Sequence, residues 1–260
     1  MRDDTAQQRG ARALALWMLG VGLIGALLTG LSAASWLQGG LRFGCSWAAG
    51  GTESGSASDG VWVCGDGIAL LMPGIAILVL GGLAVLIAAL VVLTAWHRPR
   101  ELAWLVAALA VLAVAPTVVT CLALLGYASA HDAVMHDAAA APPESRVALW
   151  QRFALPALAL TVAAGALAAL GVRMRAAGRA PRAAGALVIV ALLLVLTSAA
   201  LSMLGTLSLG LVAAGIIVAG WYLAATVAPA ARERAELRAS PPVADRRLAN
   251  GGDRPSDYPG

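Results

Sequence analysis

The nine residues Ala130–Ala138, AHDAVMHDA, hold the side chains in this sequence that are best suited to chemistry. Two of the three histidines in the 260-residue chain lie here, and an aspartate follows each of them. Imidazole and carboxylate groups are common protein ligands of zinc and of other divalent cations. We therefore identify a candidate divalent-metal site, with His131, Asp132, His136 and Asp137 as its ligands.

Helical spacing limits which of these four ligands can point toward one metal ion. Asp132 and His136 are four residues apart and share one face of a helix. His131 and His136 are five residues apart, so their rings converge only if the segment bends. The alternative interpretation is a solvated turn, in which these side chains are merely polar and lead into AAAAPPES at residues 138–145.

Two cysteines offer a second kind of chemistry. Cys45 and Cys64 bracket a segment rich in glycine and serine, and they are too far apart for the C-x-x-C pairs that carry out redox catalysis. We expect a structural disulfide, which would close a loop of about 20 residues and contribute roughly 3 kcal/mol in the chain-entropy model. The stretch GVWV before Cys64 predicts a short strand, and Asp66 is placed to cap the next helix.

The elements that carry these residues are apolar runs. The chain is 60% hydrophobic and only 12% charged, which is typical of a membrane protein. About 20 apolar residues cross a bilayer as a helix, and the last run is long enough to form two helices with a turn near Ser202–Ser208. We predict an all-α integral membrane protein, a bundle of six transmembrane helices at approximately residues 13–37, 68–96, 102–127, 150–172, 183–203 and 207–228.

Arginine placement predicts the orientation of this bundle. All 18 basic residues are arginine, and fifteen of them lie on one side if the six helices alternate. Because basic residues concentrate on the cytoplasmic side, we expect both termini in the cytoplasm. The absence of lysine and the high alanine and glycine content are typical of a GC-rich genome, so we expect the plasma membrane of a GC-rich bacterium. A cleaved signal peptide is an alternative for the first run, where LSAAS resembles a cleavage site.

The chain beyond the predicted membrane domain, residues 1–228, has a different composition. Residues 229–260 are polar and rich in proline and glycine, and they contain few large apolar side chains. Such a segment buries too little apolar surface to offset the entropy of ordering. We predict a disordered cytoplasmic tail, of which Arg232–Arg238 extend the last helix briefly.

Small residues recur every four positions in two of the predicted helices. This spacing lets helix backbones approach closely in lipid, either within one bundle or against a partner. The predicted packing positions are Gly22, Ala26, Gly30, Ala34, Ala157, Thr161, Gly165 and Ala169. Pro116 lies centrally in the third run and removes a backbone donor, so we expect a helix kink there.

The apolar cores predict which functions are absent. Intramembrane ionisable residues mark proton relays and ion pathways, and the central parts of the runs contain none. We expect no enzymatic activity, no cofactor and no nucleic-acid binding. The sequence favours an accessory or scaffold protein of the cell envelope, in contact with the lipid bilayer and with another membrane protein or itself. The alternatives are a transporter or permease subunit for a neutral or apolar solute, and the outer metal site.

Overall fold

The computed structural model of the protein describes residues 2–48, 60–94, 102–135, 144–201 and 207–239. In these residues the chain forms six long α-helices, one two-stranded antiparallel sheet and one 3-10 turn. In chain order the elements are α1 (Arg2–Leu41), β1 (Cys45–Ala48), β2 (Val61–Cys64), η1 (Ile68–Leu70), α2 (Leu71–Thr94), α3 (Leu102–Met135), α4 (Arg146–Ala176), α5 (Pro181–Leu201) and α6 (Leu207–Ala239).

All six of these helices are long and apolar enough to cross a membrane. The predicted all-α, multi-pass architecture is therefore confirmed, including the division of the last apolar run into α5 and α6. A single helix over that run would be more than twice as long as the bilayer core is thick. In the described residues α5 ends at Leu201 and α6 begins at Leu207, so the run holds two helices.

Several helices are longer than the apolar runs that predicted them. Helix α1 begins at Arg2, α3 continues to Met135, and α6 continues to Ala239. Apolarity marks only the part of a helix that crosses lipid, whereas Ala, Arg, Gln and Glu favour helix in water as well. The segment predicted to be a disordered tail therefore begins as helix, and residues 240–260 lie outside the described residues.

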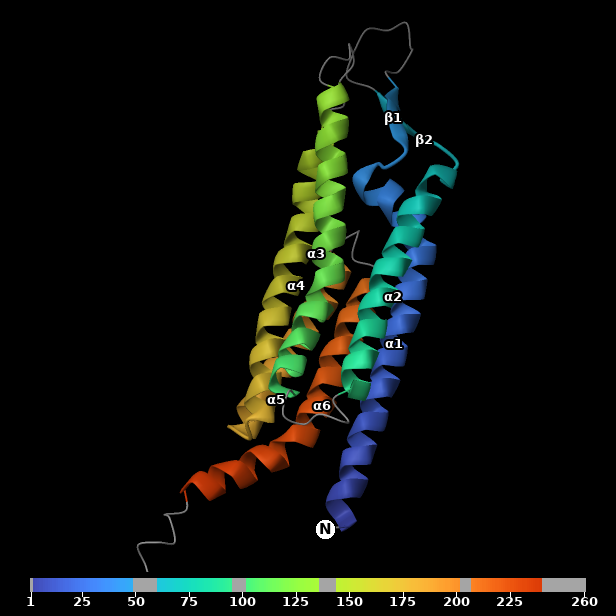
Figure 1. The fold of residues 1–260 in the computed structure, drawn as a ribbon. Coiled ribbons are helices and arrows are strands. Elements are labelled where there is room, and N and C mark those ends of the chain that lie inside the picture. The colour runs from blue at the N-terminus through green and yellow to red at the C-terminus, as the bar shows by residue number, and fades with distance from the viewer. Residues whose placement is uncertain (1, 49–59, 95–101, 136–143, 202–206, 240–260) are drawn as a thin grey trace, which may run out of the picture.

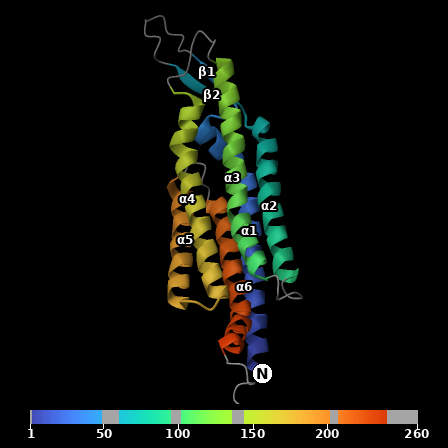
Figure 2. The same ribbon diagram turned by 60° about the vertical axis from the view of Figure 1, so that its left-hand side comes forward.

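Helix α6 lies at the centre of the bundle. Figure 1 shows α1 and α2 on one side of it and α3, α4 and α5 on the other, and Figure 2 shows α6 between α4 and α1. Helix α6 contacts each of the other five helices. In its membrane-crossing stretch 56% of the residues are buried, against 33–39% in the other helices, so most of the lipid-facing surface belongs to α1–α5.

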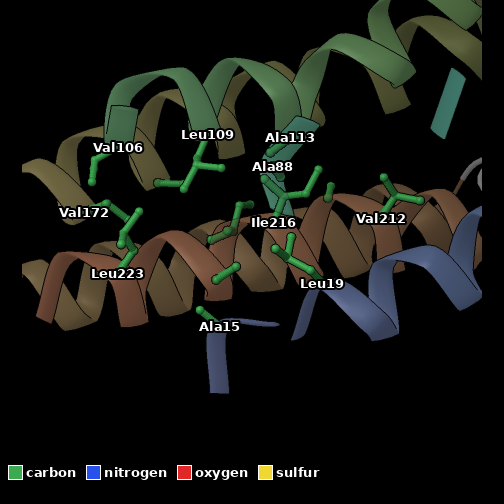
Figure 3. Packing of buried hydrophobic residues seen from close by; sticks show 14 of the residues in the cluster. Ala15, Leu19, Ala88, Val106, Leu109, Ala113, Val172, Val212, Ile216 and Leu223 are labelled. Carbon is green, nitrogen blue, oxygen red and sulfur yellow. The ribbon is translucent and has the colours of Figure 1, made fainter. Parts of the chain in front are cut away.

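The main core is built around α6 from small and branched side chains. Ile216 of α6 lies between Leu19 of α1 and Leu109 of α3, and Val212 and Leu223 lie further along α6 on either side of it, as Figure 3 shows. Many of the other buried residues are alanines, which let the helices approach closely. In lipid such close packing replaces the hydrophobic driving force that operates in water.

A second buried cluster lies nearer the end of the bundle that carries β1 and β2, which we call the hairpin end. It joins α1, α2, α3 and α4 through larger side chains than the main core uses. Trp36 and Leu37 of α1 are buried here together with Trp150 of α4 and Phe43. This cluster lies between the main core and the strands β1 and β2.

Candidate functional site at the hairpin end

The two strands form a hairpin that is fixed at its base. Strand β1 pairs with β2 so that Cys45 lies opposite Cys64 and Trp47 lies opposite Trp62. The two cysteines are joined by a disulfide. The two indole rings pack edge to face with their centroids 5.4 Å apart. An isolated two-stranded hairpin is only marginally stable in water, so the disulfide and further contacts must hold it.

Arg146 makes several of these further contacts. It is the first residue of α4 and is only 2% exposed. Its Nη2 atom donates to the carbonyl oxygen of Cys45 at 2.6 Å, and its Nη1 atom donates to the Tyr127 hydroxyl at 3.4 Å. The guanidinium carbon also lies 5.8 Å from the ring centroids of Trp62 and Tyr127. One charged side chain thus joins the hairpin, α3 and α4.

Asp132 holds the start of α4 from the neighbouring helix. Its two carboxylate oxygens accept hydrogen bonds from the backbone N–H groups of Arg146 and Val147, both at 2.9 Å. Ser145 acts as the N-cap, because its Oγ atom accepts from the Ala148 N–H at 3.1 Å. The first N–H groups of a helix have no partner within the helix, and negative charge is favourable there. The contact therefore stabilises both α4 and its junction with α3.

Aromatic rings complete the junction between the hairpin and α3. The rings of Phe43 and Tyr127 are stacked with their centroids 3.6 Å apart, and Tyr127 meets His131 edge to face at 6.2 Å. Gln38 of α1 donates from Nε2 to the carbonyl oxygen of Gly65 at 3.1 Å, which ties the base of the hairpin to α1. Asp66 was predicted to cap the helix that follows it; its Oδ1 atom accepts from the Ile68 N–H at 3.2 Å, while the N-cap residue of the 3-10 turn before α2 is Gly67.

The candidate metal site is described only in part. His131 and Asp132 lie in the last turns of α3 rather than in a loop, while His136 and Asp137 lie outside the described residues. In the described ranges no three His, Cys, Asp or Glu side chains gather as a metal-binding group. Both oxygens of Asp132 already accept hydrogen bonds. The four-ligand site stays a prediction, and zinc content measured before and after replacing His131 and His136 by alanine tests it.

The small residues of α1 face other helices of the same chain. A Cβ atom at Gly30 would lie 2.6 Å from the Cβ atom of Leu78, and one at Gly22 would lie 3.2 Å from Val85, both in α2. Ala26 is 1% exposed, and Ala34 is half-buried against the second cluster. These small residues of α1 therefore pack against other parts of the same bundle.

The small residues of α4 meet both α3 and α5. Gly165 receives the side chain of Val114 from α3, and Ala169 is half-buried. At Thr161 the contact is polar, because its Oγ1 atom lies 3.1 Å from the Ser198 Oγ atom of α5. The carbonyl oxygen of Ala157 accepts from both hydroxyl groups, at 2.8 and 2.9 Å. Close packing against α3 and hydrogen bonding to α5 thus hold α4 in the bundle.

This polar contact lines a small cavity among α1, α3, α4, α5 and α6. We call it the polar cavity, and its volume is about 30 Å³. Its hydrogen-bonding groups come from Trp36, Thr117, Thr120, Thr161 and Ser198. A cavity of this volume and polarity is large enough to hold a water molecule.

Pro116 lies in α3 beside the polar cavity. It is fully buried, and α3 continues as one helix on both sides of it. The predicted kink stays a prediction. Two tryptophans near this region differ in their hydrogen bonding. Trp150 donates from Nε1 to the carbonyl oxygen of Cys121 at 2.9 Å. The buried Nε1 atom of Trp36 has no hydrogen-bond partner among the described residues.

Sequence reasoning missed the central role of Arg146. It treated this residue as one of three arginines expected outside, with no role of its own. The available signal was local: Ser145 follows two prolines and precedes an apolar run, which is typical of a helix N-cap. The pairing with Asp132 and with the carbonyl of Cys45 had no sequence signal, because these partners lie 14 and 101 positions away.

Comparison of this chain with known protein families, with curated proteins and with solved structures finds no match. Its function must therefore be argued from the geometry of its own residues.

Proposed function

We propose that this protein is a non-enzymatic accessory or scaffold protein of the plasma membrane of a GC-rich bacterium, which binds another membrane protein through its hairpin end. The observation that carries the proposal is the fixed hairpin. A disulfide, a buried arginine and stacked aromatic rings all hold a structure that stands beyond the second core cluster. A rigid extramembrane surface reduces the entropy that a partner must overcome on binding.

The exposed side of the hairpin has the character of a contact surface. Val61 and Val63 of β2 are 66% and 54% exposed, while Trp62 between them faces Arg146. Each strand of a two-stranded sheet also has one unpaired edge, which is a template for strand addition by another chain. We expect the partner to contribute an extended extramembrane segment to this edge.

The rival function is transport of a small neutral solute. In its favour, the polar cavity lies among five helices and offers hydroxyl groups without charge. Against it, a volume of about 30 Å³ accommodates a water molecule and little more. Flux of small neutral solutes into proteoliposomes, measured beside protein-free liposomes, tests this rival. Solute-specific flux would support transport over the accessory role.

The proposal is tested by extraction from the native membrane in a mild detergent, followed by sizing and identification of stoichiometric partners. We expect one membrane protein to co-purify with the wild type. The variant R146Q should lose it, because the hairpin is no longer fixed. The matched control is R152Q, which removes an exposed arginine almost two turns further along α4 and should retain the partner. A wild-type protein that purifies alone or only with itself would contradict the proposal.

A further inference from the structure

A pocket of about 400 Å³ lies at the opposite end of the bundle, where α1 begins. We call it the Arg175 pocket. Its polar wall is formed by Gln7 and Gln8 of α1, Arg175 of α4 and Tyr222 of α6. The rest of the wall is small or apolar and includes Leu14. Three helices that are far apart in sequence therefore bring hydrogen-bonding side chains to one place.

Arg175 is held in a way that suits recognition of an anion. Its guanidinium carbon lies 3.8 Å from the ring centroid of Trp221, so one face of the group is stacked on an indole. Its Nε atom is buried and has no hydrogen-bond partner among the described residues. A stacked guanidinium keeps its plane fixed and leaves the donors on its edge for a planar or tetrahedral anion.

The level of the pocket in the membrane indicates where the anion comes from. The apolar run of α4 ends near Val172, three residues before Arg175, and that of α1 begins near Ala13, six residues after Gln7. The polar wall thus lies where hydrocarbon gives way to lipid headgroups. Leu14 lies two turns further into the membrane along α1, where it would meet the apolar part of a lipid.

From this geometry we infer that the Arg175 pocket binds the phosphate group of an anionic phospholipid. The guanidinium supplies the charge, Gln7, Gln8 and Tyr222 supply neutral hydrogen bonds to the phosphate and its headgroup, and the apolar wall accepts the start of the acyl chains. Basic pockets between transmembrane helices are suited to such headgroups. The inference rests on the membrane-spanning fold and is independent of the proposed accessory function.

The test measures lipid binding to the purified full-length protein by native mass spectrometry in mild detergent. The probes are dioctanoyl phosphatidylglycerol, dioctanoyl phosphatidylcholine and inorganic phosphate. We expect wild type to prefer phosphatidylglycerol, and R175Q to bind it at least about tenfold more weakly, because a charge-assisted hydrogen bond is lost. The control R173Q removes an exposed arginine from the same helix end and should bind like wild type.

Three results would overturn the inference. Equal weakening in R175Q and R173Q would mean that general charge attracts the lipid. Equal binding of both lipids would mean that the pocket does not select an anion. Saturation of the pocket by inorganic phosphate at the same concentration would assign it to a soluble phosphate. If R175Q does not fold, Y222F and Gln8→Leu take its place, and unchanged phosphatidylglycerol binding in both would also overturn the inference.

Discussion

At the scale of single residues, Arg146 joins the hairpin to α3 and α4. Its charge is almost fully removed from solvent, and its compensation comes from the carbonyl of Cys45, the hydroxyl of Tyr127 and two aromatic faces. Burying a charge is costly unless such partners are present. The same partners are left unsatisfied when the charge is removed, so a substitution here carries a double cost.

We expect R146Q to lower the free energy of unfolding by about 2–4 kcal/mol, since two hydrogen bonds to a charged group are lost. Thermal unfolding in detergent measures the effect. The control R152Q should change the unfolding midpoint little, because Arg152 is exposed and its guanidinium only lies over the Phe153 ring. Equal midpoints for the two variants would show that Arg146 does not fix the hairpin.

The two buried tryptophans give a matched comparison of one hydrogen bond. W150F removes the donor that reaches the Cys121 carbonyl, whereas W36F removes a donor with no partner among the described residues. Both changes lose a similar apolar area. We therefore expect W150F to lower the free energy of unfolding by about 1 kcal/mol more than W36F. Chemical or thermal unfolding of the two variants checks this, and the reverse order would point to a strong bond from Trp36 to a group in the polar cavity.

At the scale of elements, the backbones of α1 and α6 approach each other closely. A Cβ atom at Gly215 of α6 would lie 2.6 Å from the carbonyl oxygen of Met18 and 3.0 Å from the backbone nitrogen of Gly22. These atoms are backbone and cannot move aside as a flexible side chain does. The approach of α6 to α1 therefore requires a residue without a side chain.

G215A should destabilise the bundle by about 1–3 kcal/mol, because the added methyl group forces two backbones apart. The control is G20A in α1, where a Cβ atom would meet nothing within 4 Å. Since alanine favours helix over glycine, G20A should leave stability unchanged or raise it slightly. Resistance to unfolding in detergent measures both variants, and a neutral G215A would contradict the packing described for α1 and α6.

At the scale of the whole molecule, the number of crossings predicts which parts share a compartment. Six helices that each cross the membrane bring both ends of the described chain to one side and the hairpin to the other. The arginine distribution then predicts the hairpin outside the cell. The disulfide between Cys45 and Cys64 agrees with this side, since disulfides persist in oxidising compartments.

Cysteine labelling in intact cells checks this topology. The natural cysteines give a low background, because Cys45 and Cys64 are bonded to each other and Cys121 is buried. We expect a membrane-impermeant maleimide to label A133C, at the hairpin end of α3, in intact cells. R179C, at the opposite end, should react only after the cells are opened. Both positions are exposed, so labelling of R179C in intact cells would reverse the orientation.

The sequence by itself determined the class of the protein and the number of its helices. Hydrophobic length is a local property, so runs of about 20 apolar residues predict crossings without knowledge of any contact. The pairing of Cys45 with Cys64 was also predicted, because the third cysteine, Cys121, lies inside an apolar run. The short strand before Cys64 was also predicted, although its partner β1 was not.

Only the tertiary structure decided what the polar residues do. Asp132 was predicted as a metal ligand, and the fold places both its oxygens on the first amides of α4. Arg146 carried no signal of its own, yet it joins three elements. The central position of α6, the polar cavity and the Arg175 pocket likewise depend on which helices are neighbours. Neighbours are chosen by the summed packing of many small contacts across the bundle, and no short stretch of sequence contains that sum.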